Sequence, residues 1–189
     1  MSWKSKTTPL DGITPNQIKL LHTVRRYWLD YVLWMRALLF SIAFSLPDRE
    51  AVTRRLYRNP EDFFLLFSAL YGERPAGQLR ELMKKQTDCA SMLMEAVCKE
   101  DAQTLAGIRK EGYQNAEQLS IFLQSINESW TGALWQALLE EQLEMTEEEA
   151  VFVHSGNNVE GIARFEGLLE LSNTMADEMA NGLMRQFRL

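Results

Sequence analysis

Residues 14–48 read TPNQIKLLHTVRRYWLDYVLWMRALLFSIAFSLPD and contain one complete helix together with both of its ends. Thr14 and Gln17 have the spacing of a capping box, and Pro15 stands at the first helical position, where proline is favoured. Pro47 disfavours helical backbone just before it, so the helix should end near residues 45–48. Between these ends, apolar side chains recur every three or four residues, as on one face of a helix: Leu21, Val24, Trp28, Tyr31, Met35, Leu38 and Ile42.

Similar signals continue along the chain. They predict short helices over residues 49–57 and from Asn59-Pro60 to Gly72, and long helices over about 76–99, 102–126 and 159–187. Between the last two, we expect a medium helix carrying Trp130, Leu134, Trp135, Leu138 and Leu139, then a short helix that a second capping box, Thr146 to Glu149, opens. No segment alternates apolar and polar residues as a strand does.

The pattern predicts an all-α fold, an antiparallel bundle of four long helices with additional short ones. We expect residues 1–189 to form a single domain, with 1–13 as a loose N-terminal segment. The order long helix, two shorter helices, long helix occurs twice, which suggests two similar halves.

The composition narrows the class of protein. The chain has 189 residues, 46% of them hydrophobic, and a net charge of −6, so neither disorder nor general nucleic-acid binding is expected. No apolar run could cross a bilayer, and Met1 to Leu10 lacks the core of a signal peptide. Cys89 and Cys98 would lie about 13.5 Å apart on one helix and could not form a disulfide. We therefore expect a cytoplasmic protein that binds neither membrane nor nucleic acid.

Charge is unevenly distributed along the chain. Arg49, Arg54, Arg55 and Arg58 cluster in the first half, and six glutamates cluster within residues 140–149. Arg54, Arg55 and Arg58 are candidates for an anion-binding patch, and the glutamates for a partner surface. Alternatively, the two halves are electrostatically complementary and dock on each other.

Five polar residues fall on the apolar stripes near the helix midpoints: Tyr31, Gln86, Asn115, Glu166 and Asn173. In an antiparallel bundle these midpoints share one level, so the five should form a polar layer in the core. Each would cost about 1–3 kcal/mol if buried without a partner. The layer is either a pocket for a small polar molecule, with Trp28 and Trp34 as further lining residues, or a network that satisfies itself and fixes the helix register.

Several short motifs together resemble a family of uncharacterised all-helical proteins from Gram-positive bacteria, some of which carry the name acetylglutamate kinase. The resemblance covers residues 20–188. The motifs that carry it are Trp34-Met35-Arg36, Leu46-Pro47-Asp48, Val52-Thr53-Arg54-Arg55-Leu56, Arg58-Asn59-Pro60-Glu61-Asp62-Phe63, Tyr71-Gly72, Asn115-Ala116, Phe122-Leu123, Ser125-Ile126-Asn127, Trp130, Met175-Ala176-Asp177 and Gln186-Phe187. The chain has no glycine-rich nucleotide loop, so kinase activity is not expected.

The resemblance also bears on a metal site. It implies histidines at the positions of Tyr31, Gln86 and Gln142, and acidic residues at or near Glu117, Glu166 and Asp177. Histidines and carboxylates in a helical core would suit a metal ion. Here Tyr31 and two glutamines replace the histidines, so the resemblance favours a retained pocket without a metal and adds Gln142 to its lining.

Three hypotheses follow. The first is a non-enzymatic bundle that binds a small polar ligand among Tyr31, Gln86, Asn115, Gln142 and Glu166. The second is a structural or interaction protein, a homo-oligomer among the options, with a self-satisfied core and its function on the charged surfaces. The third is a metal-dependent enzyme that uses Glu117, Glu166, Glu170 and Asp177. A cavity of roughly 300 Å³ or more among the named side chains would favour the first over the second.

Overall fold

The computed structural model describes residues 14–188 as seven helices: α1 (Pro15–Ala43), α2 (Arg49–Leu56), α3 (Asn59–Tyr71), α4 (Glu73–Cys98), α5 (Ala102–Ile126), α6 (Gly132–His154) and α7 (Asn158–Phe187). The predicted loose segment, residues 1–13, lies outside the described range. Within that range there is no strand, so the all-α prediction is confirmed.

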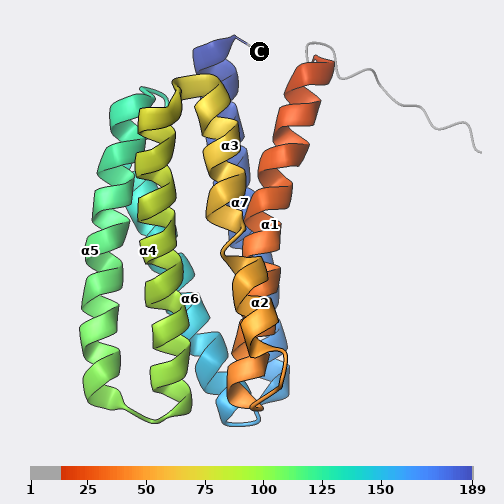
Figure 1. Cartoon of the computed structure of the whole chain (residues 1–189), viewed down its shortest axis with the longest axis vertical. Coiled ribbons are helices and arrows are strands. Elements are labelled where there is room, and N and C mark those ends of the chain that lie inside the picture. Colours follow the sequence, from red (N-terminus) through yellow and green to blue (C-terminus); the bar gives the residue numbers. More distant parts are fainter. Residues whose placement is uncertain (1–13, 189) are drawn as a thin grey trace, which may run out of the picture.

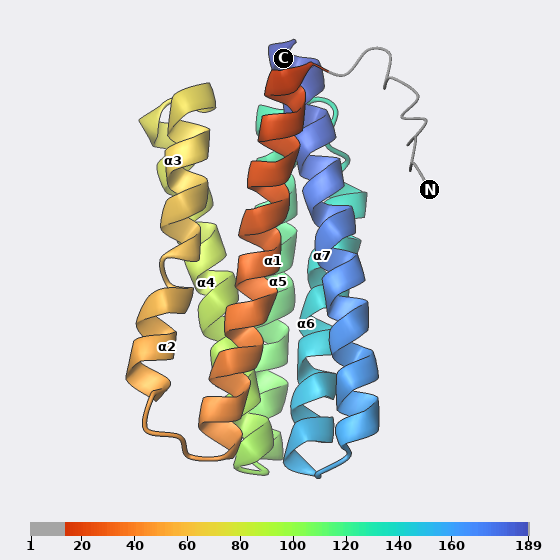
Figure 2. The ribbon, with the colours of Figure 1, turned by 90° about the vertical axis from the view of Figure 1, so that its right-hand side faces the viewer.

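The helices pack antiparallel and alternate in direction along the bundle (Figure 1). In that view α1 runs downwards, α2 and α3 together run back up as one interrupted helix, and α4 to α7 alternate down and up. Figure 2 shows α2 and α3 stacked end to end beside α1 and α4. The seven helices therefore occupy six antiparallel positions.

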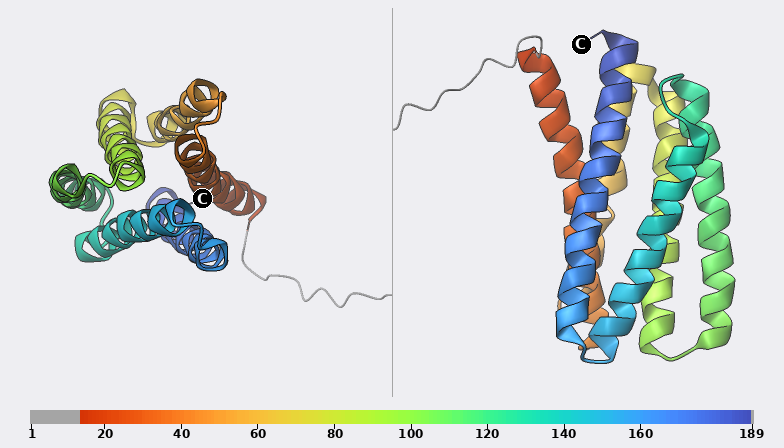
Figure 3. Two further views of the ribbon diagram at one scale, coloured as in Figure 1. Left: turned by 90° about the horizontal axis from the view of Figure 1, so that it is seen from below. Right: turned by 180° about the vertical axis from the view of Figure 1, so that it is seen from behind.

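Neighbours in sequence are also neighbours around the bundle (Figure 3). Three helices, α1, α4 and α6, also contact one another across the middle. The others pack outside them: α7 between α1 and α6, α5 between α4 and α6, and α2 and α3 along α1 and α4. Buried apolar side chains from all seven helices form one core around α1, α4 and α6.

The local signals at the first helix act as predicted. Thr14 Oγ1 accepts a hydrogen bond from the Gln17 amide, and Gln17 Oε1 accepts one from the Thr14 amide, which completes the capping box before Pro15. At the break between α2 and α3, the Asn59 side chain donates to the Tyr27 carbonyl at 2.7 Å. This bond ties the break to α1.

The second predicted capping box is wrong. Thr146 lies inside α6, which is continuous over 23 residues, and its hydroxyl donates to the Gln142 carbonyl at 2.7 Å. The segment has no proline or glycine to stop the helix, and Thr146 and Ala150 are buried against neighbouring helices. The bundle consequently has five long helices of 23–30 residues rather than the predicted four.

Because α6 is one continuous helix, the two halves of the chain are less similar than predicted. The middle position of the first half is interrupted between α2 and α3, whereas α6 fills that of the second half without a break. The middle helices of the two halves also differ in how deeply they lie in the bundle. Helix α6 contacts α1 and α4 across the middle, whereas α2 packs on α1 at the edge.

Two further predictions concern the cysteines and the lack of a membrane-spanning segment. Cys89 and Cys98 both lie on α4 as free thiols. Across residues 14–188, no helix combines the length and the apolar character that crossing a bilayer requires.

Candidate functional site

Four polar residues from four different helices lie in the core of the bundle. Tyr31 on α1, Gln86 on α4, Asn115 on α5 and Gln142 on α6 are each at most 4% exposed. Asn115 Nδ2 donates to Gln86 Oε1 at 2.8 Å, and Gln142 Nε2 donates to the Met175 sulfur at 3.6 Å. Asn115 Oδ1 has no hydrogen-bond partner among the described residues. Protein groups therefore satisfy part of the layer's hydrogen-bonding capacity.

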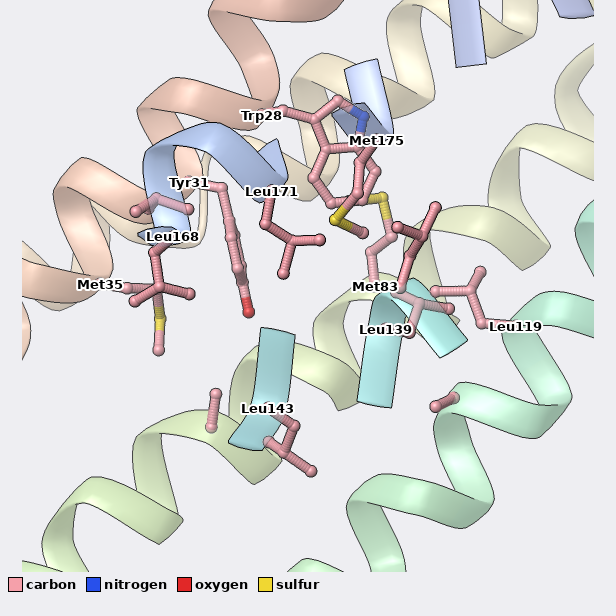
Figure 4. Close-up of a cluster of buried hydrophobic side chains, with 14 of the residues drawn as sticks. Trp28, Tyr31, Met35, Met83, Leu119, Leu139, Leu143, Leu168, Leu171 and Met175 are labelled. Carbon is pink, nitrogen blue, oxygen red and sulfur yellow. The ribbon is translucent and has the colours of Figure 1, made fainter. Parts of the chain in front are cut away.

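Tyr31 reaches from α1 into the middle of the bundle, among Met35, Leu168 and Leu171 (Figure 4). Burial raises the pKa of its phenol, against the opposing effect of a hydrogen bond with Thr87. The phenol is consequently neutral at physiological pH and can take part in hydrogen bonds only as an uncharged group.

The predicted placement of Glu166 in the core is wrong, because its side chain is exposed, and Asn173 is only partly buried. Helix α7 instead buries the face that carries Leu168, Leu171 and Met175. The face predicted to be buried and the face that is buried differ by a rotation of about 100° around the helix axis, which is the angle between successive residues. Both have helical spacing, so only the contacts with α1 and α6 decide between them.

The two tryptophans proposed as lining residues have different surroundings. Trp28 is buried and stacks on Trp135, with ring centroids 6.1 Å apart. Its indole nitrogen has no acceptor among the described residues. Trp34 is only partly buried and lies beneath the Arg55 guanidinium, 4.9 Å from its ring centroid.

Glu149 is a buried carboxylate that the sequence analysis placed in a surface cluster. It is 3% exposed and accepts a hydrogen bond from Arg36, whose guanidinium lies over the rings of Phe40 and Phe165. Burial raises the pKa of Glu149 to about 7, although Arg36 acts in the opposite direction. One sequence signal could have found it: Glu149 follows Gln142 by seven residues, which places both on one face of the helix.

Glu149 is one of three consecutive glutamates on α6 that pair with three different helices. Glu147 pairs with Arg109 of α5 at 2.5 and 3.0 Å, and Glu148 with Arg164 of α7 at 2.9 Å. Successive side chains point about 100° apart around a helix, so three neighbours of α6 are reached from one turn. These three glutamates of the acidic cluster connect helices within the molecule.

A cavity in the core is bounded by Tyr31, Gln142, Thr146 and Glu149 and has a volume of about 10 Å³. This space is about what one water molecule requires, and it is far below the roughly 300 Å³ of a typical ligand pocket. By the volume criterion set out above, the core favours a filled polar layer over a central pocket.

The arginines proposed as an anion patch are divided among different partners. Arg55 pairs with Asp30 at 2.8 Å, whereas Arg54 is exposed and lies 3.9 Å from Glu50. Arg58 is exposed and makes no ion pair within residues 14–188.

The carboxylates proposed for a metal are not brought together. Glu117 is exposed on α5, Glu166 and Glu170 are exposed on α7, and Asp177 pairs with Arg25 through two 2.7 Å hydrogen bonds. In the part of the chain that the structure describes, no three acidic, histidine or cysteine side chains converge as metal ligands.

A groove of about 340 Å³ opens between α2 and α4. It forms because α3 packs along α4, whereas α2 packs on α1. Two residues of α2 and Tyr57, which follows its last residue, face three residues of α4 across it, and Leu38 of α1 and Met92 of α4 complete its lining. The facing pairs are Arg49 with Glu95, Thr53 with Ser91, and Tyr57 with Asp88.

Only the two outer pairs are joined by hydrogen bonds. Arg49 donates to Glu95 and the Tyr57 hydroxyl donates to Asp88. Between them, the Thr53 hydroxyl donates to its own helix at the Arg49 carbonyl. The Ser91 oxygen is closed off from the groove and has no partner among the described residues. Sequence reasoning missed this site, because its residues are brought together only by the packing of α2 against α1.

No protein-family model, curated protein or solved structure matches the chain. The resemblance drawn from its motifs stays a prediction.

Proposed function

We propose that the protein is a non-enzymatic binding module whose small polar ligand occupies the groove between α2 and α4. The observation that carries this proposal is the groove itself, an open space of about 340 Å³ lined by both apolar and polar side chains.

The size and lining of the groove also support this location. Its volume of about 340 Å³ lies at the lower end of the range for small-molecule sites, roughly 300–1,000 Å³. Leu38 and Met92 offer apolar contact, while the Thr53 hydroxyl and the Asp88 carboxylate offer polar groups. This combination of apolar surface with a few polar groups is typical of ligand sites.

A larger groove, between α5 and α6, is a weaker candidate. Its volume is about 440 Å³, but several of its polar groups already pair with α6. Arg109 pairs with Glu147, the Tyr113 hydroxyl donates to Glu144, and Gln136 donates to Glu140. A ligand there would have to compete with these contacts.

The core polar layer supports a structural role for the residues first considered as a pocket. Gln86 and Asn115 bond to each other, and Glu149 pairs with Arg36. Such contacts between helices favour a single register of α4 with α5 and of α1 with α6. We propose that they shape the scaffold on which the groove is built.

A fragment screen by NMR on the full chain tests the location of the site. We expect small polar fragments to shift the amides of residues 49–57 and 88–95. Thr53→Met should abolish these shifts, because its longer side chain fills the groove. Gln114→Met, in the groove between α5 and α6, is the matched control and should leave them unchanged. Hits that cluster along α5 and α6, or that survive Thr53→Met, would show the proposal to be wrong.

A further inference from the structure

The outer side of α1 carries an apolar stripe about 22 Å long. Its residues recur every three or four positions, as on one face of a helix: Leu29, Leu33, Ala37, Phe40 and Phe44. Leu33 and Phe44 are 49% and 57% exposed, and the other three are partly buried. Figure 2 shows α1 in front, with α2 and α3 on one side of it and α7 on the other. Apolar surface of this kind marks a contact with another molecule.

The helices that flank the stripe carry opposite charges. On the α2 side, Arg54 and Arg58 are exposed; Arg58 has no ion pair within residues 14–188, and Arg54 makes only a weak, exposed contact with Glu50 at 3.9 Å. On the α7 side, Glu166 and Glu170 are exposed and make no ion pair within the same range. These two glutamates are four residues apart on one helix and repel each other. Each flank would therefore be stabilised by a partner of opposite charge.

The charges of the two flanks lie at the same level of the bundle. Arg55, between the two arginines in sequence, pairs with Asp30 of α1. The ring of Phe165, which directly precedes the first glutamate, lies beneath Arg36 of α1. Asp30 and Arg36 are each three residues from Leu33, so both flanking pairs lie beside the middle of the stripe. They are also the only charged residues of α1 between residues 29 and 44, and both are paired within the molecule.

From this arrangement we infer that the stripe on α1 packs against the same stripe of a second copy of the chain, with the two-fold axis parallel to the helices. Rotation about that axis places α2 of each copy against α7 of the other. Because α2 and α7 run in the same direction (Figure 1), Arg54 faces Glu166 of the other copy and Arg58 faces Glu170. The result is an apolar centre with a charged rim, as in other protein interfaces.

The charges also select this orientation over the alternative one. A two-fold axis perpendicular to the helices would place arginines against arginines and glutamates against glutamates, which is unfavourable. The proposed dimer leaves the groove between α2 and α4 open, since neither Arg54 nor Arg58 lines it. The inference is thus independent of the proposed function.

Sedimentation equilibrium of the full chain tests for the dimer at concentrations from about 1 to 500 µM, the range expected for an interface of modest size. We expect the mass to rise with concentration from the 21.8 kDa of one chain towards twice that value. Added salt should shift the protein back towards the monomer, because the facing charges attract each other. A mass that stays at that of one chain throughout, or a dimer that salt strengthens, would overturn the inference.

Leu33→Glu tests the apolar centre. It places a carboxylate where the two stripes meet, so we expect association to weaken by more than about tenfold. Leu33 is half exposed in the single chain, so the fold should be retained. Ile121→Glu, at a site on α5 that is 61% exposed, is the matched control and should dimerise like the wild type. If Leu33→Glu dimerises as well as the control does, the stripe is not the interface.

Charge reversal tests the two flanks. A variant with Arg54→Glu and Arg58→Glu, and another with Glu166→Lys and Glu170→Lys, should each dimerise more than about tenfold more weakly than the wild type, because like charges then face each other. An equimolar mixture of the two should restore the dimer, since each copy supplies the charge that the other lacks. Restoration also shows that both variants are folded. Full dimerisation of either variant alone, or a mixture that stays monomeric, would contradict the pairing of α2 with α7.

Discussion

At the scale of single residues, the most unusual group is Glu149, a carboxylate buried in the core beside Arg36. Its pKa of about 7 lies well above its ordinary value of 4.5, because burial disfavours the charged form. Between about pH 4.5 and pH 7, Glu149 is ionised in the unfolded chain, whereas the folded protein still holds its proton. The stability that this group contributes is therefore complete below about pH 4.5 and is lost as the pH rises through about 7.

Glu149→Gln should remove this dependence on pH. We expect the wild-type protein to lose about 2–3 kcal/mol of unfolding free energy relative to the variant between pH 5 and pH 8. Urea denaturation at both pH values measures the difference. Glu148→Gln, which changes the adjacent exposed glutamate, is the control and should follow the wild type. Parallel curves for wild type and Glu149→Gln would contradict the assignment.

At the scale of helices, close approach depends on small residues at a few positions. Gly182 on α7 lies directly against the indole of Trp130, which is 1% exposed and donates to the Glu178 carbonyl at 3.2 Å. A methyl group added at Gly182 would overlap the indole ring. Because Trp130 also packs on Phe67 and Trp135, it has little room to move. The segment before α6 is thereby held against the last turns of α7.

Gly182→Ala should destabilise the protein by about 1–3 kcal/mol, the usual cost of overpacking a core. Gly107→Ala is the matched control: it lies inside α5 with no atom within 4 Å of the added methyl group. There, alanine should stabilise the helix by about 0.5–1 kcal/mol. Thermal and urea unfolding measure both changes. Equal effects at the two positions would mean that Trp130 does not constrain α7.

At the scale of the whole molecule, stability is unevenly distributed over the six positions of the bundle. Helix α2 has eight residues, buries only Val52 and Leu56, and packs on α1 at the edge. Helix α3 shares the same position in the bundle but packs along α4 and has Phe63 and Phe67 fully buried. Segments with few buried contacts open at the lowest free energy.

Native-state hydrogen exchange should therefore distinguish these helices. We expect the amides of α2 to exchange through openings of lower free energy than those of α3, α4 and α6. A ligand in the groove should slow exchange in α2 selectively, because α2 forms one wall of the site. Protection of α2 equal to that of α6 would contradict this distribution of stability.

Much of the secondary structure can be predicted from the chain because its signals are local. The Thr14 capping box, Asn59-Pro60 and the end of α5 at Ile126 are all determined by residues within a few positions of each boundary. The burial of Tyr31, Gln86 and Asn115 agrees with their helical spacing for the same reason. Thr146 shows the limit of such signals, because a capping pattern within a segment of strongly helix-forming residues does not end the helix.

The local sequence thus specifies where helices begin and end and which side of most of them is apolar, since caps, prolines and periodicity act within a few residues. Tertiary packing alone decided the rotation of α7 that exposes Glu166, the burial of Glu149 beside Arg36, and the groove between α2 and α4. Each depends on which neighbour a helix contacts. That choice is made by the fit of whole faces across the bundle, between residues as far apart in sequence as Arg36 and Glu149.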